Sequence, residues 1–484
     1  MKKTLLYLAI ALTSVGLSAD YVKSKLESGM LSAKVLPQPN ASPQSAANKP
    51  VRNEPRIKGI PVSCYTTSIV NVGEHTFEHP VAWSDIAIAY IEAKQYDQAQ
   101  EIIAQKIIAK ILPDDSDGLT KISMKYAEQG QYNQALELAK SIVVGEYGKG
   151  GSNRETAITY LVDRLAHAKQ YNRAFKTVKQ IDDSSFRTMA MAHIAKAYAK
   201  AGQKQKAEAL FSQALKAANS IEDENYQRPR LIAFPKSNAL VSVAEDQAEA
   251  GQYEQALQIA SIISNDYKRG LLEAIAISYA SAGQVEQAHE LLSQALQITK
   301  NSPESGRMGY PVRARALSNN ANAYAKAGFH QEALQIANSI ENSGERSLAL
   351  MNLADVYIDS RENIRANEAL LQATQVDGVM KPQEKTIYYL IDIASKYFKI
   401  NQPRKANEML VSALQFAKNI KASTESKSLE KAQILERIAR EYASIGQYSK
   451  AIQIFTANTD LMDVGTSQKE TVIGLLECAE AAQK

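Results

Sequence analysis

Apolar side chains recur along most of the chain with the period of an α-helix, and short turns interrupt them at intervals. In residues 271–295, LLEAIAISYASAGQVEQAHELLSQA, a first apolar stripe at i, i+3, i+4 and i+7 consists of Leu272, Ile275, Ala276 and Tyr279. Gly283 ends this stripe, because glycine adopts a positive φ without steric cost. A second stripe consists of Ala288, Leu292 and Ala295. The stretch therefore predicts two amphipathic helices that fold back on each other.

The same arrangement recurs ten times, and each copy is identified here by its centre, the residue equivalent to Tyr279. The ten centres are Tyr90, Tyr126, Leu165, Tyr198, Gln247, Tyr279, Tyr324, Tyr357, Tyr397 and Tyr442. An alanine stands nine residues after each centre, at Ala99, Ala135, Ala174, Ala207, Ala256, Ala288, Ala333, Ala366, Ala406 and Ala451. Because alanine lets two helix backbones approach closely, this fixed spacing predicts ten helical hairpins.

This pattern resembles the tetratricopeptide (TPR) repeat. Besides the alanine, it has a bulky residue seven before the centre, an alanine three before it, and a small or polar turn residue four after it. The resemblance covers residues 80–457 and implies an all-α, right-handed α-solenoid whose first helices line a concave, partner-binding groove. Two features depart from the family: the proline that often ends a TPR motif is mostly missing, and several repeats are longer than the usual length of about 34 residues.

The spacing of the ten repeat alanines predicts two kinds of hairpin. Between Ala174 and Ala406 the spacings alternate between short and long, which indicates second helices that are alternately brief and extended. Residues 271–295 belong to the long kind. After the solenoid, which we expect to span residues 80–465, residues 466–484 predict one more helix that caps the apolar end of the stack.

The first nineteen residues have the layout of a secretory signal peptide. Lys2 and Lys3 precede an apolar run from Leu5 to Leu17, and small residues lead to Ala19. We expect cleavage after Ala19; an uncleaved anchor is the alternative, because Leu17 is bulkier than the residue usual at its position. No later apolar run approaches the length of about 18 residues that a membrane span needs. The mature chain is therefore expected in the periplasm or outside the cell.

Residues 20–79 lie between the signal peptide and the first predicted helix. Residues 20–58 mix Pro, Ser, Asn and Gln with few large apolar residues after Leu36, which is typical of a tether. Residues 59–79 are more apolar and β-branched, and we expect them to lie as an extended segment against the first helix. Pro80 then begins the helical region.

The two cysteines, Cys64 and Cys478, stand near opposite ends of the mature chain. Export permits a disulfide between them. Packed helices are about 8–10 Å apart, however, so a stack of ten hairpins would hold the two ends far beyond bridging distance. We therefore expect two free thiols.

The charge of the chain does not identify its partner. Lys and Arg number 56 against 52 Asp and Glu, a formal net charge of +4, which is too small for 484 residues to favour nucleic acid or an anionic membrane surface. Together with the TPR resemblance, this favours a protein or peptide partner and no nucleic acid. The oligomeric state stays open.

Residue patterns of catalytic and metal sites are absent from the sequence. The six histidines are scattered, at His75, His79, His167, His193, His289 and His330, and His289 lacks the second histidine of a helical zinc site. The GEYGKGG run at residues 145–151 lacks the Lys-Ser/Thr of a phosphate-binding loop. We therefore predict no metal, no cofactor and no catalytic residue, and a protein that is not an enzyme.

Two sets of residues are candidates for partner binding. The family's convention places groove residues on first helices two or six before the centre, and with two neighbours the candidates are Lys196, Glu245, Glu273, Arg315, Ser318, Asn319, Asn322 and Arg440. Loops after two of the long second helices interleave arginine and tyrosine, and their candidates are Arg228, Arg230, Arg307, Tyr310 and Arg313. The alternative for both sets is that they are ordinary solvated residues.

The sequence leads to two hypotheses of function. The first is an exported, non-enzymatic scaffold or adaptor that holds a peptide or protein in the groove or on the edge loops. The alternative is a solenoid associated with the processing or binding of cell-wall glycans, similar to the helical superstructure of lytic transglycosylases. That family needs a compact catalytic domain, for which the residues after Gly465 leave no room.

Overall fold

The computed structural model describes the helical part of the chain and a short stretch before it. The described residues are 55–57, 60–62, 64, 83–108, 116–142, 151–222, 235–306, 311–376, 384–421, 424–457 and 466–482. They fall into two compact units: unit 1 comprises Met1–Ile57 and Pro61–Ala239, and unit 2 comprises Lys58–Ile60 and Leu240–Lys484. Each unit has buried apolar side chains of its own.

Helical hairpins follow one another through both units, each consisting of a first and a second helix. Those before the boundary are α4 (Trp83–Glu92) with α5 (Tyr96–Ile108), α6 (Ser116–Glu128) with α7 (Tyr132–Ser141), α8 (Gly151–His167) with α9 (Tyr171–Val178), and α10 (Ser184–Lys200) with α11 (Lys204–Asn219). The boundary between the units falls within α12 (Pro235–Glu249), which is followed by α13 (Tyr253–Ile262).

The later hairpins belong to unit 2. They are α14 (Asn265–Ser281) with α15 (Val285–Lys300), α16 (Val312–Lys326) with α17 (His330–Asn338), α18 (Ser343–Asp359) with α19 (Asn363–Gln375), α20 (Glu384–Lys399) with α21 (Pro403–Lys418), and α22 (Glu425–Ser444) with α23 (Tyr448–Ala457). A last helix, α24 (Thr466–Ala481), packs against α23 and buries Leu476 and Ala479. The predicted all-α fold of ten hairpins and a C-terminal helix is confirmed.

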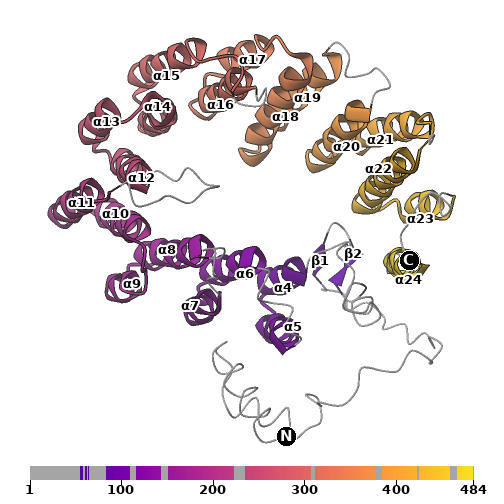
Figure 1. Cartoon of the computed structure of the whole chain (residues 1–484), viewed down its shortest axis with the longest axis horizontal. Coiled ribbons are helices and arrows are strands. Elements are labelled where there is room, and N and C mark those ends of the chain that lie inside the picture. Colours follow the sequence, from indigo (N-terminus) through magenta and orange to yellow (C-terminus); the bar gives the residue numbers. More distant parts are fainter. Residues whose placement is uncertain are drawn as a thin grey trace, which may run out of the picture. The chain divides into compact units, whose positions relative to one another are not determined.

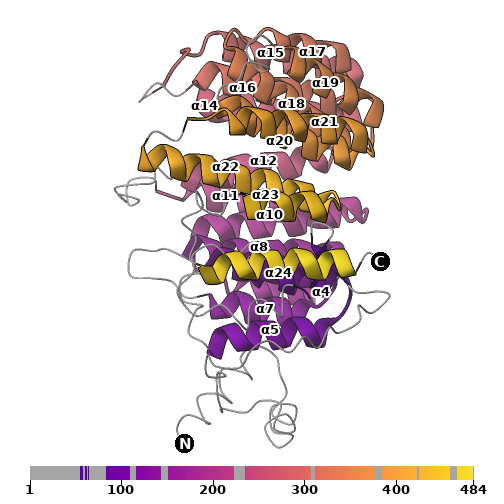
Figure 2. The same ribbon diagram turned by 90° about the vertical axis from the view of Figure 1, so that its right-hand side faces the viewer.

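In unit 2 the helices form two layers. The first helices α14, α16, α18, α20 and α22 contact one another in sequence and make one layer, and their second helices make the other (Figure 1). Viewed from the side, neighbouring helices of the unit run nearly parallel across the picture (Figure 2). A hairpin therefore buries its apolar surface against the hairpins before and after it, as expected for a solenoid.

Every hairpin turns through a residue in the left-handed region of φ, four residues after the centre. Six of these residues are glycines with φ between 75° and 90°: Gly130, Gly202, Gly251, Gly283, Gly328 and Gly446. The other four are Lys94, Lys169, Arg361 and Asn401, with φ between 58° and 61°. In each turn the next N–H donates to the carbonyl of the centre, as Gln284 does to Tyr279 at 2.9 Å. This bond belongs to the Schellman motif that ends many helices.

The alanine nine residues after the centre is fully buried in all ten hairpins. The exposed fraction is 0% at Ala99, Ala135, Ala174, Ala207, Ala256, Ala288, Ala333, Ala366, Ala406 and Ala451. A larger side chain at these sites would collide with packed neighbours, because protein interiors have no room for added methylenes. The burial of all ten alanines is what the predicted close approach of the helices requires.

The lengths of the second helices follow the predicted alternation. From α9 to α15 they have 8, 16, 10 and 16 residues, and α17 and α19 continue with 9 and 13. The alternation ends at α21, which again has 16 residues. The long second helix predicted to follow residues 271–284 is α15.

Both cysteines are disulfide-bonded, so the expectation of two free thiols is wrong. That expectation added one helix spacing per hairpin along a straight line. In helical-repeat proteins each repeat is rotated relative to the one before it. The distance between the first and the last repeat therefore does not grow in proportion to the number of repeats. Cys64 is buried, with 2% of its surface exposed.

The chain before the first helix is described only in part. Strands β1 (Arg56–Ile57) and β2 (Ile60–Pro61) pair with each other, and β1 lies against α4. The predicted signal peptide, residues 1–19, lies outside the described residues, as does most of the predicted tether. Among the described helices, none combines the length and apolar character that crossing a membrane requires.

Candidate partner-binding faces

One side of the first-helix layer of unit 2 is open, and its side chains stand at fixed places in each repeat. The residues five before the centre are exposed or half-buried, namely Ala274, Asn319, Asn352, Asp392 and Arg437. Those two before the centre are half-buried, namely Ile277, Asn322, Asp355, Ser395 and Arg440. We call this surface the first-helix face of unit 2.

Neighbouring first helices of unit 2 run parallel and in register. Arg437 on α22 donates from Nη2 to Asp392 Oδ1 on α20 at 2.7 Å, and both residues stand five before their centres. Asn352 on α18 donates from Nδ2 to Ser318 Oγ on α16 at 3.3 Å, one position apart in the repeat. Equal positions of successive repeats therefore form rows across the face.

Three of the predicted groove residues, Glu273, Ser318 and Lys196, are buried rather than open, with exposed fractions of 9%, 7% and 8%. Glu273 and Ser318 stand six before the centre, where the side chain points toward the next first helix, and Lys196 stands two before the centre on α10. Glu245, Asn322 and Arg440 are half-buried. Arg315 and Asn319 are exposed.

Glu273 is the acceptor of a buried polar contact between α14 and α16. Its Oε1 accepts hydrogen bonds from Arg269 Nη1 and from Asn320 Nδ2, each at 2.6 Å. Burial raises the pKa of Glu273, and the guanidinium of Arg269 offsets only part of this rise. Asn320 occupies a position that is apolar in other repeats, such as Ile275, so this contact replaces a hydrophobic one.

Charged residues further along the face are paired across helices. Lys396 on α20 forms an ion pair with Asp355 on α18. The guanidinium of Arg437, besides its bond to Asp392, lies over the ring of Tyr388 at 5.2 Å from the centroid. Within α22, Arg440 donates to Glu436 Oε1, from Nε at 2.9 Å. These pairs leave the face with little uncompensated charge in the described part of α18, α20 and α22.

Unit 1 carries a polar network across its own first helices. Lys125 Nζ on α6 lies 2.9 Å from Glu92 Oε1 on α4 and 2.8 Å from Glu128 Oε2. Tyr160 on α8 donates from its hydroxyl to Glu128 Oε1 at 2.9 Å. The hydrogen bond to Glu128 raises the pKa of Lys125. Burial pushes the pKa of Glu128 upward, but the bonds from Lys125 and Tyr160 outweigh it, so that pKa is lowered.

The predicted edge-loop residues are mostly outside the described residues. This applies to Arg228, Arg230, Arg307 and Tyr310. Arg313 is described and lies in the first turn of α16, where it donates from Nε and Nη2 to the carbonyl of Ser302 at 2.9 and 2.7 Å. Its guanidinium therefore closes the connection between α15 and α16.

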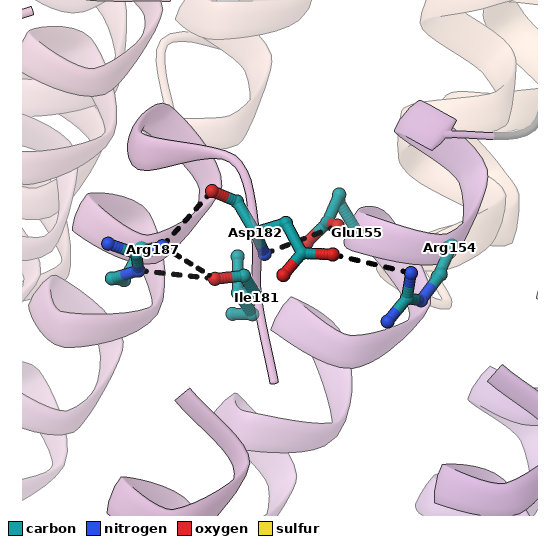
Figure 3. A network of polar contacts seen from close by, with 5 residues as sticks. All are labelled: Arg154, Glu155, Ile181, Asp182 and Arg187. Atoms are coloured by element: carbon teal, nitrogen blue, oxygen red, sulfur yellow. Dashed lines mark hydrogen bonds and ion pairs between the residues drawn. The ribbon is translucent and has the colours of Figure 1, made fainter. Parts of the chain in front are cut away.

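A similar arginine closes the connection between α9 and α10 in unit 1. Arg187 donates to the carbonyls of Ile181 and Asp182 at distances of 2.9 to 3.1 Å (Figure 3). On the other side of this connection, the N–H of Asp182 donates to Glu155 Oε1 at 3.4 Å, and its carboxylate lies 3.4 Å from Arg154 Nη1 (Figure 3). The network fixes the path of the chain between hairpins.

Sequence reasoning missed this arginine, although the sequence carries a signal for it. An isoleucine at the end of a short second helix is followed six residues later by an arginine at Arg187, Arg269 and Arg346. Arg346 donates to the carbonyl of Ile340 at 3.2 Å, as Arg187 does to Ile181. Arg269 instead donates to Glu273, the buried acceptor described above.

Sequence reasoning also missed most of the exposed rows. Asn352, Asp392 and Arg437 stand five before their centres, a position that the family convention does not assign to the groove. Comparing residues at that position across the repeats would have found them, because their types are polar where the buried positions beside them are apolar. Among the described residues, no group of three or more His, Cys, Asp or Glu side chains is placed to hold a metal ion.

No family model matches the chain. A curated relative, cellulose synthase operon protein C of Pseudomonas fluorescens (strain SBW25), is 24% identical over 386 residues, which cover 76% of this chain and 28% of that protein. The chain therefore spans less than a third of the length of this relative.

Solved structures with a likeness to the chain include proteins with TPR repeats. The TPR-like repeats of a putative kinesin light chain of Podosopora anserina are 21% identical and cover 41% of this chain and 97% of that chain, with a TM-score of 0.25. The TPR domain of P58(IPK) is 17% identical and covers 76% of this chain and 99% of that chain, with a TM-score of 0.19. The chain's own repeat, ten hairpins with a left-handed turn residue and a buried alanine, gives it a TPR-like fold.

Proposed function

We propose that this chain is a non-enzymatic scaffold that holds a protein or peptide partner on its first-helix faces. The observation that carries the proposal is the repetition of open positions on successive first helices, polar on α16, α18, α20 and α22 and in register, beside positions that are buried. Such a surface is long and rigid, and it offers many small contacts rather than one cleft. This favours binding over catalysis.

The test is cross-linking of the full chain in its native compartment, followed by identification of the captured partner. A photo-reactive residue at Asn319 or Arg437, both open on the face, should capture a defined partner. The same residue at Gln375, exposed on the second helix α19, is the matched control and should not. Equal capture from both positions would contradict binding on the first-helix face.

We propose further that the protein acts in the cell envelope or outside the cell. Support comes from the signal-peptide layout of residues 1–19 and from the likeness to cellulose synthase operon protein C. Amino-terminal sequencing of the protein recovered from the envelope fraction should begin at Asp20. A chain that begins at Met1 and stays in the membrane fraction would support the uncleaved anchor instead.

Association with a glycan pathway is the second candidate function, and the name of the curated relative is the observation that favours it. A solenoid of this kind would organise glycan-handling proteins or touch the glycan itself. Incubation of the purified protein with cell-wall fragments tests the enzymatic version, and no turnover is expected. Robust turnover would overturn the scaffold proposal.

A further inference from the structure

A group of exposed cations lies on the second-helix layer of unit 1, and we call it the basic patch. In this unit the first helices α4, α6, α8 and α10 contact one another, and their second helices lie on one side of them (Figure 1). The patch covers α9, α11 and the turn before α9, and its members are Lys169, Arg173, Lys176, Lys179, Lys204 and Lys206. All six residues are exposed, so a partner on this layer can reach each of them.

Contacts at the starts of α9 and α11 join the two parts of the patch. Tyr171, which begins α9, stacks on Tyr198 of α10 with ring centroids 4.0 Å apart. Lys206 on α11 places its Nζ 5.5 Å from the centroid of the same Tyr198 ring. The two second helices therefore begin beside one aromatic ring, and their cations belong to one stretch of surface.

The charge of the patch is not neutralised by carboxylates. Arg173 donates to two uncharged oxygens, Gln170 Oε1 and Asn133 Oδ1, each at 2.8 Å. Lys206 donates to Gln203 Oε1 at 2.8 Å. None of the six cations forms an ion pair within the part of the chain that the structure describes. The patch therefore keeps its full positive charge there.

Two carboxylates that follow the patch in the sequence have other partners. Asp182 Oδ2 lies 3.4 Å from Arg154 Nη1. Asp183 accepts hydrogen bonds from the backbone N–H groups of Ser185 and Phe186 at the start of α10. Both belong to the connection between α9 and α10, at the end of α9 that is remote from its turn.

Glu208 is the one carboxylate on α9 and α11, and its repeat position faces away from α9. It stands one residue after the repeat alanine of α11. Asn367 on α19 and Asn407 on α21 occupy the same position, and each accepts a hydrogen bond from a lysine on the following second helix. Glu208 therefore lies at the far edge of the patch, on the side toward α13.

An exposed aromatic ring stands among these cations. Phe175 on α9 is 36% exposed, and among the described side chains of unit 1 it is the one large apolar residue that is open. Lys176 and Lys179 stand two and five residues after the buried Ala174. At about 3.6 residues per turn, both point away from the first helices. The outer surface of α9 thus combines an apolar ring with lysines beside it.

This chemistry fits the surface of a bilayer that contains anionic phospholipids. Five of the six cations are lysines, whose hydrated ammonium groups on flexible stems attract phosphates as point charges. Lysine is depleted from interfaces between proteins, and arginine is the residue that grips carboxylates in a bidentate manner. Cations beside an exposed aromatic ring are typical of surfaces that bind anionic lipids, where the ring enters the headgroup region.

The small net charge of the whole chain does not oppose such binding. Salt at physiological concentration screens exposed charges over about 8 Å. A bilayer therefore responds to the cations that face it and not to the balance of 56 basic and 52 acidic residues along the chain. The local excess of positive charge on α9 and α11 decides the attraction.

From these observations we infer that the basic patch of unit 1 docks on the surface of a bilayer that contains anionic phospholipids, with its lysines at headgroup phosphates and Phe175 in the headgroup region. The inference goes beyond the scaffold proposal, because it assigns a partner to the second-helix layer and leaves the first-helix faces open. Docking is reversible, and no covalent bond is made or broken.

Co-sedimentation of the full chain with lipid vesicles tests the inference. Vesicles of equal parts phosphatidylglycerol and phosphatidylcholine should bind the protein, and vesicles of phosphatidylcholine alone should not. High ionic strength should weaken binding, because salt screens the attraction. The double variant Lys176→Gln/Lys179→Gln should weaken it by about fivefold for each lysine removed. Phe175→Ala, which keeps every cation, should also weaken it.

The double variant Lys121→Gln/Lys140→Gln is the matched control. Both lysines are exposed in unit 1, so the variant changes the net charge by the same amount. Lys140 on α7 stands at the repeat position of Lys179 but lies 3.1 Å from Glu137 Oε1. Vesicle binding should be unchanged, and circular dichroism should show the same helix content in both double variants.

Several outcomes would overturn the inference. These are no binding to the anionic vesicles, equal binding to the neutral vesicles, or equal effects of the two double variants. All variants keep residues 1–19, so binding through that apolar run would not respond to the substitutions and would also count against the patch. A polyglutamate peptide is the acidic-peptide probe: if it binds through Lys176 and Lys179 while the anionic vesicles do not bind, the partner is a peptide and the inference is wrong.

Discussion

At the scale of single residues, the turn of each hairpin requires one residue with a left-handed backbone conformation. All ten turns place a left-handed residue four after the centre, and glycine meets this demand in six of them. A residue with a Cβ atom in that conformation is less stable by about 1–2 kcal/mol. The four lysine, arginine and asparagine turns therefore retain a strain that the glycine turns avoid.

Exchanging residues at these turns should change stability in opposite directions. Lys169→Gly should raise the free energy of unfolding by about 1 kcal/mol, because it removes the left-handed strain. Gly283→Ala should lower it by a similar amount through the backbone alone, since a Cβ atom there would meet no atom within 4 Å. Urea unfolding followed by circular dichroism measures both, and a decrease for Lys169→Gly would contradict this account.

Glu273 gives the stability of unit 2 a dependence on pH. The pKa of Glu273 is raised in the folded state, mainly by burial, so its contribution to stability is fully present below the unfolded pKa and is lost as pH rises through the folded pKa. Glu273→Gln cannot ionise. The free energy of unfolding of Glu273→Gln minus that of wild type should therefore be larger at pH 7 than at pH 4.

Urea midpoints of wild type and Glu273→Gln at the two pH values measure the difference. The matched control is Glu286→Gln, which makes the same substitution at an exposed carboxyl in the first turn of α15. If the urea midpoints of Glu273→Gln and wild type differ by the same amount at both pH values, ionisation of Glu273 does not affect the stability of unit 2.

At the scale of elements, hairpins are held together by contacts that cross from one repeat to the next. Tyr253, which begins α13, stacks on Tyr279 of α14 with ring centroids 3.9 Å apart, and Tyr171 stacks on Tyr198 in unit 1 at 4.0 Å. Each pair joins a second helix to the first helix of the following hairpin. A hairpin therefore gains stability mainly from its neighbours.

Removing the ring of Tyr279 should loosen this junction. Tyr279→Ala should lower the free energy of unfolding by about 3–5 kcal/mol, the usual cost of deleting a buried aromatic ring, because Tyr279 is 7% exposed. Tyr279→Phe keeps the stacked ring and should cost much less. Thermal unfolding of both variants is the measurement, and an unchanged midpoint for Tyr279→Ala would show that the stacking does not support the junction.

The arginine that closes the α9–α10 connection should also contribute to stability. Arg187→Ala removes the donors to the carbonyls of Ile181 and Asp182 and should cost about 1–2 kcal/mol. Lys204→Ala changes an exposed cation at the start of α11 and is the control, with little expected effect. Equal urea midpoints for the two variants would mean that the hydrogen bonds of Arg187 do not stabilise the connection between α9 and α10.

At the scale of the whole molecule, the disulfide state of the two cysteines is the finding that repeat-by-repeat reasoning could not reach. The structure has Cys64 and Cys478 oxidised. The protein denatured without reductant should therefore show no thiol that reacts with a maleimide reagent, and after reduction it should show two. Two reactive thiols before reduction would restore the expectation drawn from the sequence.

The division into two units is likewise a property of the whole chain. The ten centres continue through α12 without a break in the sequence pattern, yet the compact units separate within that helix. The right-handed superhelix implied by the resemblance stays a prediction, as do the boundaries expected for the signal peptide and the tether.

The sequence by itself determined the repeat: ten hairpins, the place of each turn, the buried alanines and the alternation of second-helix lengths. These follow from contacts between residues a few positions apart, and such contacts leave a periodic pattern in the sequence. Only the tertiary structure decided which polar residues are open. Glu273 and Asn319 stand one repeat position apart, yet one is buried against α16 and the other exposed, because the packing of the next helix sets which side of a helix is covered. The same holds for the oxidation of the two cysteines, which no short-range pattern in the sequence encodes.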